Sequence, residues 1–204
     1  LTANLNIANA LLSNSGNYTV EVTGECGSLQ SDIAVVRVDS VTVIQLHPVS
    51  TSACAGTAVN FSVAATGTNL SYQWQKDGVD LSNGGNISGA SGPVLTLTNS
   101  TPADNGAYRC IVGGDCNTVT SNIATLDNYE NTLITTQPVD LELCEGAQIA
   151  LNITASGDLL TWQWKKDGSD LTDEADISGS TTANLIINNP TTASSGIYTC
   201  LVNG

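Results

Sequence analysis

A period of 90 residues constrains this chain more than any other feature of its sequence. The stretch YQWQKDG at residues 72–78 returns as WQWKKDG at residues 162–168. An alignment of 41 positions that begins at these two stretches needs no gap and has 18 identities. The spacing extends to the front of the chain, where Cys26 lies 90 residues before Cys116. Self-similarity at a fixed spacing indicates a tandem array.

The period divides the chain into three parts. Residues 1–38 match the C-terminal part of a repeat, residues 41–127 make one complete repeat, and residues 130–204 match the N-terminal majority of a third. A repeat of 90 residues falls within the usual size of a domain that has its own core. The junctions between repeats are very short, so we expect an extended, beaded chain.

Each repeat has the residue pattern of short β-strands. Apolar residues alternate with polar ones in Val59-x-Phe61-x-Val63 and in Tyr108-x-Cys110. This period of two is typical of a half-buried strand, and the turn residues between such runs favour a sandwich or a barrel. The sequence therefore predicts an all-β fold.

Charge and composition exclude several partners. The formal charge is −14 at pH 7, with five basic residues against 19 acidic ones. Such a surface repels nucleic acid and anionic lipid, and no apolar run reaches the length of a membrane helix. The six cysteines suit an oxidising compartment.

The repeated phrase resembles strand C of an immunoglobulin-like sandwich, where a tryptophan fills the space between two sheets. Trp74 and Trp164 fit that position, and the Asp-Gly pair that follows each fits a tight hairpin turn. Residues 137–157 look like the A′–B segment of the intermediate set. The resemblance implies tandem immunoglobulin-like sandwiches with a tyrosine corner at Tyr18, Tyr108 and Tyr198.

The repeats depart from the usual inter-sheet disulfide. Val63 and Ile153 occupy the strand B position of the first cysteine, which leaves Cys110 and Cys200 as candidate free thiols in the core. This pattern resembles immunoglobulin-like repeats of large bacterial surface proteins, namely the adhesins and gliding-associated proteins of the Bacteroidetes type. That resemblance implies a protein displayed outside the cell.

Four further cysteines are candidates for disulfides between neighbouring repeats. Cys54 and Cys144 precede strand B at one end of a sandwich, whereas Cys26 and Cys116 lie in the F–G hairpin at the other end. A sandwich is roughly 20 Å long, which exceeds the reach of a disulfide, so a bridge across one unit is disfavoured. An alternative is a bridge within one unit from Cys54 to Cys110.

Other candidate sites are weaker. His47 is the only histidine and is interpreted as a surface residue. The acidic stretches 127–130 and 167–176 lack the ligand spacing of a calcium loop, although calcium at a junction stays an option. Four side chains beside strand C are candidates for sugar contact, with strand packing as the alternative interpretation: Tyr72, Asp80, Trp162 and Asp170.

Three classes of function follow. The leading one is a non-enzymatic structural or adhesive repeat that spaces a terminal domain from the cell surface or builds a filament. The alternatives are an accessory glycan-binding module of a secreted enzyme and an animal-type receptor ectodomain. No nucleophile–base pair or metal cluster is visible, so enzyme activity and cofactors are not expected. Expected partners are neighbouring repeats, a surface glycan or protein, and other copies of the chain.

Overall fold

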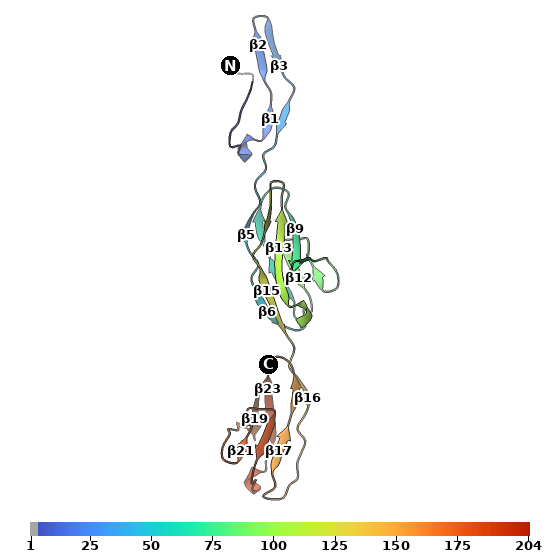
Figure 1. Cartoon of the computed structure of the whole chain (residues 1–204), viewed down its shortest axis with the longest axis vertical. Helices are drawn as coiled ribbons and strands as arrows, with labels where there is room; N and C mark the ends of the chain where they lie inside the picture. Colours follow the sequence, from blue (N-terminus) through green and yellow to red (C-terminus); the bar gives the residue numbers. More distant parts are fainter. Residues whose placement is uncertain (1–3) are drawn as a thin grey trace. The chain divides into compact units, whose positions relative to one another are not determined.

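The computed structural model describes residues 4–204, and its regular structure is almost entirely β (Figure 1). Within these residues the helical elements are 3-10 turns of three residues each, η1 (Leu12–Asn14), η2 (Pro102–Asp104) and η3 (Thr192–Ser194). No helix among the described residues is long and apolar enough to cross a membrane. The prediction of an all-β chain is confirmed.

Contacts divide the chain into two compact units. The first unit comprises residues 1–51, 59–98 and 106–126, and the second comprises residues 52–58, 99–105 and 127–204. The first unit therefore holds the front segment together with most of the middle sandwich. The second unit holds the third sandwich together with three short segments of the middle one.

The front segment forms an antiparallel ribbon. Its strands pair as β1 with β4 and as β2 with β3. By the 90-residue period, residues 16–36 of this ribbon are equivalent to residues 106–126 of the middle sandwich, which contain its F and G strands. The four strands are β1 (Gly16–Tyr18), β2 (Glu21–Gly24), β3 (Gly27–Gln30) and β4 (Ala34–Val36).

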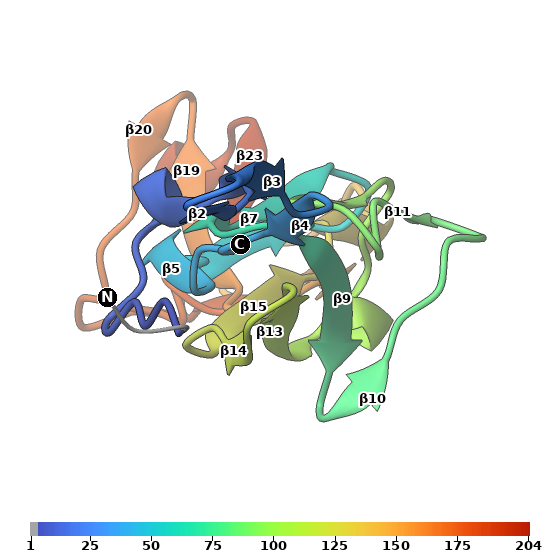
Figure 2. The same ribbon diagram turned by 90° about the horizontal axis from the view of Figure 1, so that it is seen from above.

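The middle sandwich has two main sheets, which lie on opposite sides when viewed from above (Figure 2). One sheet has the order β10 (Val79–Asp80), β9 (Ser71–Lys76), β13 (Gly106–Gly113), β15 (Ala124–Tyr129) and β6 (Thr51–Cys54), with β14 (Thr118–Thr120) also paired to β13. The other has the order β11 (Ile87–Ser88), β12 (Val94–Leu97) and β7 (Val59–Ser62). A separate pair joins β5 (Val43–Leu46) to β8 (Ala64–Thr66).

The third sandwich repeats this plan over the residues that the structure describes. One sheet has the order β20 (Ser169–Asp170), β19 (Thr161–Lys166) and β23 (Tyr198–Asn203). The other has the order β17 (Ile149–Asn152), β22 (Asn184–Ile187) and β21 (Ile177–Ser178). β16 (Leu133–Thr136) pairs with β18 (Thr154–Ser156).

The core of each sandwich lies between its two sheets, because alternate residues of every strand face inward. In the middle sandwich the Phe61 ring stacks on Tyr108 at a centroid distance of 4.8 Å and lies 6.3 Å from Trp74. In the third sandwich the buried cluster consists of Leu151, Ile153, Trp164, Leu185 and Ile187.

The repeated Lys-Asp-Gly phrase forms a tight turn at the end of strand C. Asp77 and Gly78 have φ angles of 51° and 84°, and Asp167 and Gly168 have φ angles of 50° and 84°. Two successive positive φ angles define the hairpin turn whose twist matches that of the flanking strands. The turn connects β9 to β10, and its counterpart connects β19 to β20.

Candidate functional site

Apart from Tyr18, which lies on strand β1 of the front ribbon, the predicted core residues lie on the inner faces of the middle and third sandwiches. Trp74 and Trp164 are fully buried, and each indole Nε1–H donates to a backbone carbonyl at 2.9 Å, on Gly92 and Thr182 respectively. Tyr108 is buried, whereas Tyr18 and Tyr198 are half-buried. The hydroxyls of the two half-buried tyrosines donate to backbone carbonyls four residues upstream, at 2.9 Å on Asn14 and at 2.7 Å on Ser194.

The positions of the usual inter-sheet disulfide hold apolar residues on one side and thiols on the other. Val63 and Ile153 are buried on the inner face. Cys110 is fully buried, and burial raises the pKa of its thiol to about 11. Cys200 is half-buried, and desolvation also raises its pKa. These two sites are thus suited to small apolar side chains rather than to reactive thiolates.

The other four cysteines are exposed thiols: Cys26, Cys54, Cys116 and Cys144. The Cys116 Sγ donates to the Asp39 carbonyl at 3.4 Å, which places this hairpin cysteine against the junction that precedes the middle sandwich. The Ala55 N–H, next to Cys54, donates to the Tyr129 carbonyl at 2.8 Å. Asp39 and Tyr129 are equivalent positions of the repeat. The disulfide pairing stays a prediction.

In the acidic stretch 167–176, Asp167, Asp170 and Asp173 each bind a different partner within the third sandwich. Asp167 accepts a hydrogen bond from the Ile197 N–H at 2.9 Å, and Lys165 pairs with Asp170. Asp173 accepts from the Ser180 N–H at 2.8 Å, and hydrogen bonds with Ser180 lower the pKa of this carboxyl below its ordinary value. Within residues 4–204 no three His, Cys, Asp or Glu side chains converge as a metal site would require.

The side chains considered for sugar contact serve mainly in packing and pairing. Trp162 packs against the core cluster of the third sandwich, and its Nε1 is buried without a hydrogen-bond partner among the described residues. Asp80 accepts from the Gln75 side chain at 2.7 Å. His47 is half-buried, and its Nδ1 accepts from the Asn122 N–H at 3.1 Å.

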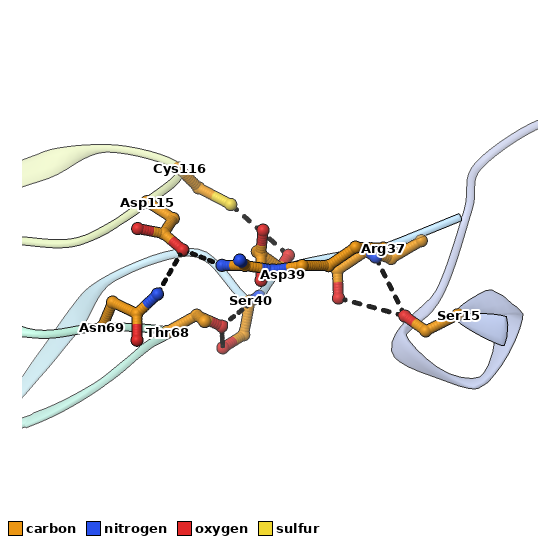
Figure 3. A network of polar contacts seen from close by, with 9 residues as sticks. Ser15, Arg37, Asp39, Ser40, Thr68, Asn69, Asp115 and Cys116 are labelled. Carbon is orange, nitrogen blue, oxygen red and sulfur yellow. Dashed lines mark hydrogen bonds and ion pairs between the residues drawn. The ribbon is translucent and has the colours of Figure 1, made fainter. Parts of the chain in front are cut away.

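A polar network holds the junction between the front segment and the middle sandwich (Figure 3). Arg37 bonds Asp39 through its Nε at 2.7 Å and reaches Asp115 with its Nη2. These two carboxylates raise the pKa of the arginine, with the hydrogen bond to Asp39 as the larger cause. Asp115 also accepts from the Asn69 side chain at 2.7 Å. One basic side chain thus connects the junction to a hairpin of the sandwich.

The backbone of the same junction is held by side chains of the loops around it. The Ser40 N–H donates to Thr68 Oγ1 at 3.0 Å. The Thr42 N–H donates to Asn117 Oδ1 at 2.6 Å, and the Asn117 amide donates back to the Thr42 carbonyl at 3.2 Å. Gly67 allows this close approach, because a Cβ there would lie 3.1 Å from the Thr42 Cα.

The junction before the third sandwich has the same kind of contact 90 residues later, a hydrogen bond from its backbone to a loop side chain. The Glu130 N–H donates to Asp158 Oδ2 at 2.7 Å, where Ser40 and Thr68 are the equivalent positions. A Cβ on Gly157 would lie 3.0 Å from the Thr132 Cα, as at Gly67.

Sequence reasoning identified these junctions by their shortness but missed the side chains that hold them, above all Thr68 and Asp158. The period contained the signal, because an oxygen-bearing side chain follows a glycine at both equivalent positions: Gly67-Thr68 and Gly157-Asp158.

Comparisons with known proteins agree with this architecture. A family model described as "Immunoglobulin domain" matches residues 43–113 and 133–203. Among curated proteins, cell adhesion molecule DSCAM of Gallus gallus is 26% identical over 209 aligned positions, which cover 97% of this chain and 10% of DSCAM. Contactin of Drosophila melanogaster is 28% identical over 137 positions, covering 64% of this chain and 10% of contactin. This chain therefore spans about a tenth of the length of these relatives.

Solved structures of tandem domains have the same fold. Extracellular domains 3–5 of Drosophila OTK match with a TM-score of 0.64 at 20% identity, over 97% of this chain and 69% of that one. Immunoglobulin domains 1–4 of Sidekick-1 match with a TM-score of 0.68 at 24% identity, over 96% of this chain and 56% of that one. The prediction of tandem sandwiches of this class is confirmed.

Proposed function

This chain belongs to the immunoglobulin domain family, and on that premise we propose that it is a non-enzymatic segment of an extracellular adhesion-type protein, in which it acts as a stiff spacer. Its first partners are the neighbouring repeats of the same protein. A surface ligand and assembly into filaments belong to the same proposal. The domain limits at residues 1–38, 41–127 and 130–204 are part of it.

One observation carries the proposal: two equivalent junctions are fixed in the same way. In each, a backbone N–H of the connecting residue donates to a loop side chain of the following sandwich, from Ser40 to Thr68 and from Glu130 to Asp158. A connection whose backbone polar groups are bonded to a rigid sandwich loses much of its freedom. A spacer needs this property, whereas a flexible tether does not.

The kind of surface protein has two candidates. The bacterial type, which resembles adhesins and gliding-associated proteins, is supported by Val63 and Ile153 at the strand B positions where receptor domains usually carry a cysteine. An animal-type receptor ectodomain is supported by the similarity to DSCAM and contactin. The complete gene distinguishes them, because it reveals the secretion and anchoring segments that flank the repeats.

Backbone relaxation of the 15N-labelled chain tests the spacer role. We expect order parameters for residues 39–41 and 129–131 close to the value of about 0.85 that is typical of rigid backbone. Order parameters below about 0.6 at both junctions would reject the spacer role.

A pair of variants shows whether the loop side chains cause this rigidity. Thr68→Val removes the acceptor for the Ser40 N–H while preserving the shape of the side chain. It should lower the order parameters of residues 39–41 and leave those of the strands unchanged. Thr96→Val is the matched control, because it removes a threonine hydrogen bond to Asn60 on the sheet surface, away from the junction.

A further inference from the structure

One side of the middle sandwich carries no charged side chain. It is formed by β5, β7, β8, β11 and β12, where β7 and β8 are consecutive parts of one strand on either side of Val63. These strands lie within residues 40–75 and 81–103, which contain none of the five basic and 19 acidic residues of the chain. The opposite sheet differs, because Lys76, Asp80 and Arg109 lie on β9, β10 and β13.

The third sandwich has the same separation of charge. The counterparts of those strands are β16, β17, β18, β21 and β22, which lie within residues 131–139, 146–157 and 177–191. These ranges also lack Asp, Glu, Lys and Arg. Charged pairs occur on the opposite sheet, where Lys165 of β19 pairs with Asp170 of β20. In a chain with a net charge of −14, two equivalent sandwiches thus keep the same side neutral.

The outward side chains on this side are small and neutral. Val59, Phe61, Leu95 and Leu97 point into the core, so the residues that alternate with them point outward. We call the outward residues of each sandwich its uncharged face. In the middle sandwich it consists of Asn60, Ser62, Ala64, Thr66, Val94 and Thr96. In the third it consists of Ala150, Asn152, Thr154, Ser156, Asn184 and Ile186.

Polar side chains on these faces bind one another across neighbouring strands. Thr96 Oγ1 on β12 donates to Asn60 Oδ1 on β7 at 2.7 Å. The hydroxyls of Thr135 on β16 and Thr154 on β18 lie 2.8 Å apart. A polar group that already has a protein partner costs less free energy to remove from water than one without. The faces can therefore be covered by another surface at a small cost.

We propose that the uncharged faces dock onto the uncharged faces of a second copy of this chain. Charge selects this occupant, because other surfaces of two chains of −14 bring carboxylates together whereas these faces do not. Sheets pack face to face at about 10 Å, as they do within a sandwich. The same face of both copies then meets across a two-fold axis. This inference rests on the filament assembly of the proposed function, and it names the surface responsible.

The size of one face indicates a weak contact. Strands spaced about 4.8 Å apart give such a face an area of roughly 350 Å². A stable interface buries about 800 Å² on each partner. A single pair of faces should therefore associate only at high concentration, and each further repeat that engages should strengthen the association.

Sedimentation of the intact chain at pH 7 tests the proposal through its salt dependence. Association should strengthen when NaCl is raised from about 0.05 M to about 0.5 M, because salt screens the repulsion between acidic chains but leaves a neutral contact intact. Association that weakens with salt would show that opposite charges hold the copies together, and would overturn the proposal. Single chains at every salt and protein concentration would overturn it as well.

Two double variants locate the contact. Ser62 and Asn152 are exposed equivalent positions, and Ser62→Glu with Asn152→Glu places a charge on both uncharged faces. The control is Thr125→Glu with Thr199→Glu, which adds the same charge at exposed positions of β15 and β23 on the opposite sheets. The face variant should have a dimer Kd about tenfold or more above that of the control. Equal Kd values for the two variants would contradict docking through these faces.

Mixing oppositely charged variants tests the pairing of like faces. Ser62→Lys with Asn152→Lys should associate weakly alone, yet it should associate with the Glu variant of the same positions, because opposite charges then meet across the two faces. Circular dichroism should show that both variants keep the fold of the unaltered chain. Folded variants whose mixture associates no better than either alone would reject face-to-face docking. The junction order parameters are measured separately, so this result would leave the spacer role standing.

Discussion

Each of the two core tryptophans combines a large apolar surface with one polar atom that needs a partner. Trp74 donates to the carbonyl of Gly92 and Trp164 to the carbonyl of Thr182, both at 2.9 Å. Gly92 and Thr182 are equivalent positions of the repeat although their side chains differ. A backbone carbonyl serves as acceptor whatever its side chain is. The sequence therefore predicts the tryptophans from their pattern, but the acceptor is visible only in the folded chain.

The buried thiol of Cys110 leads to a prediction about pH. Burial raises its pKa from 9.0 to about 11, so the unfolded chain releases this proton at lower pH than the folded chain. The free energy of unfolding should accordingly contain a contribution that is intact below pH 9.0 and is lost as the pH rises toward about 11. Urea unfolding across this range measures it.

Two variants isolate the Cys110 contribution. Cys110→Ala should make the free energy of unfolding fall less steeply over the alkaline range, because the titrating group is gone. Cys54→Ala, at an exposed thiol, should retain the slope of the unaltered chain. An unchanged slope in Cys110→Ala would contradict the prediction.

At the scale of the element, the strand C hairpin depends on backbone conformation. Gly78 has a φ of 84°, and a Cβ added to it meets no atom within 4 Å. The cost of Gly78→Ala therefore comes from the left-handed backbone alone, and we expect it to be about 1 kcal/mol. Gly89→Ala should cost more, because its Cβ would lie 1.9 Å from the Val94 carbonyl oxygen.

Thermal or urea unfolding of these variants measures the two losses of stability and shows whether Gly89→Ala costs more than Gly78→Ala. Gly24→Ala is the control, because Gly24 lies in an exposed strand without a positive φ and its Cβ would have open space. A Gly78→Ala variant as stable as the unaltered chain would show that the hairpin does not require the left-handed conformation.

The same scale shows where pattern and structure diverge. The resemblance of residues 137–157 to an A′–B segment implies strands on both sides of Cys144, yet the structure has a strand there only from Ile149 onward. In the middle sandwich the equivalent strand β6 forms beside β15. A strand at an edge depends on hydrogen bonds from a neighbour, so its own sequence does not suffice to form it.

At the scale of the whole molecule, charge controls association. The chain carries −14 at pH 7 and has an isoelectric point near 4.1. Mutual repulsion should weaken the attraction between copies at neutral pH and vanish as carboxylates are protonated. We expect light scattering to show more self-association near pH 4 than at pH 7. Single chains at both values would show that net charge does not keep the copies apart.

The sequence by itself determined the period, the all-β class and the buried Trp–Tyr core. These properties depend on local rules, such as alternation along a strand and the turn chemistry of Asp-Gly, which recur in every repeat. Only the tertiary structure decided which side chains hold the junctions. Thr68 and Ser40 are 28 residues apart, and so are Asp158 and Glu130. Such pairs meet only when the sandwiches close, because their contacts depend on the positions of whole strands rather than on any local preference.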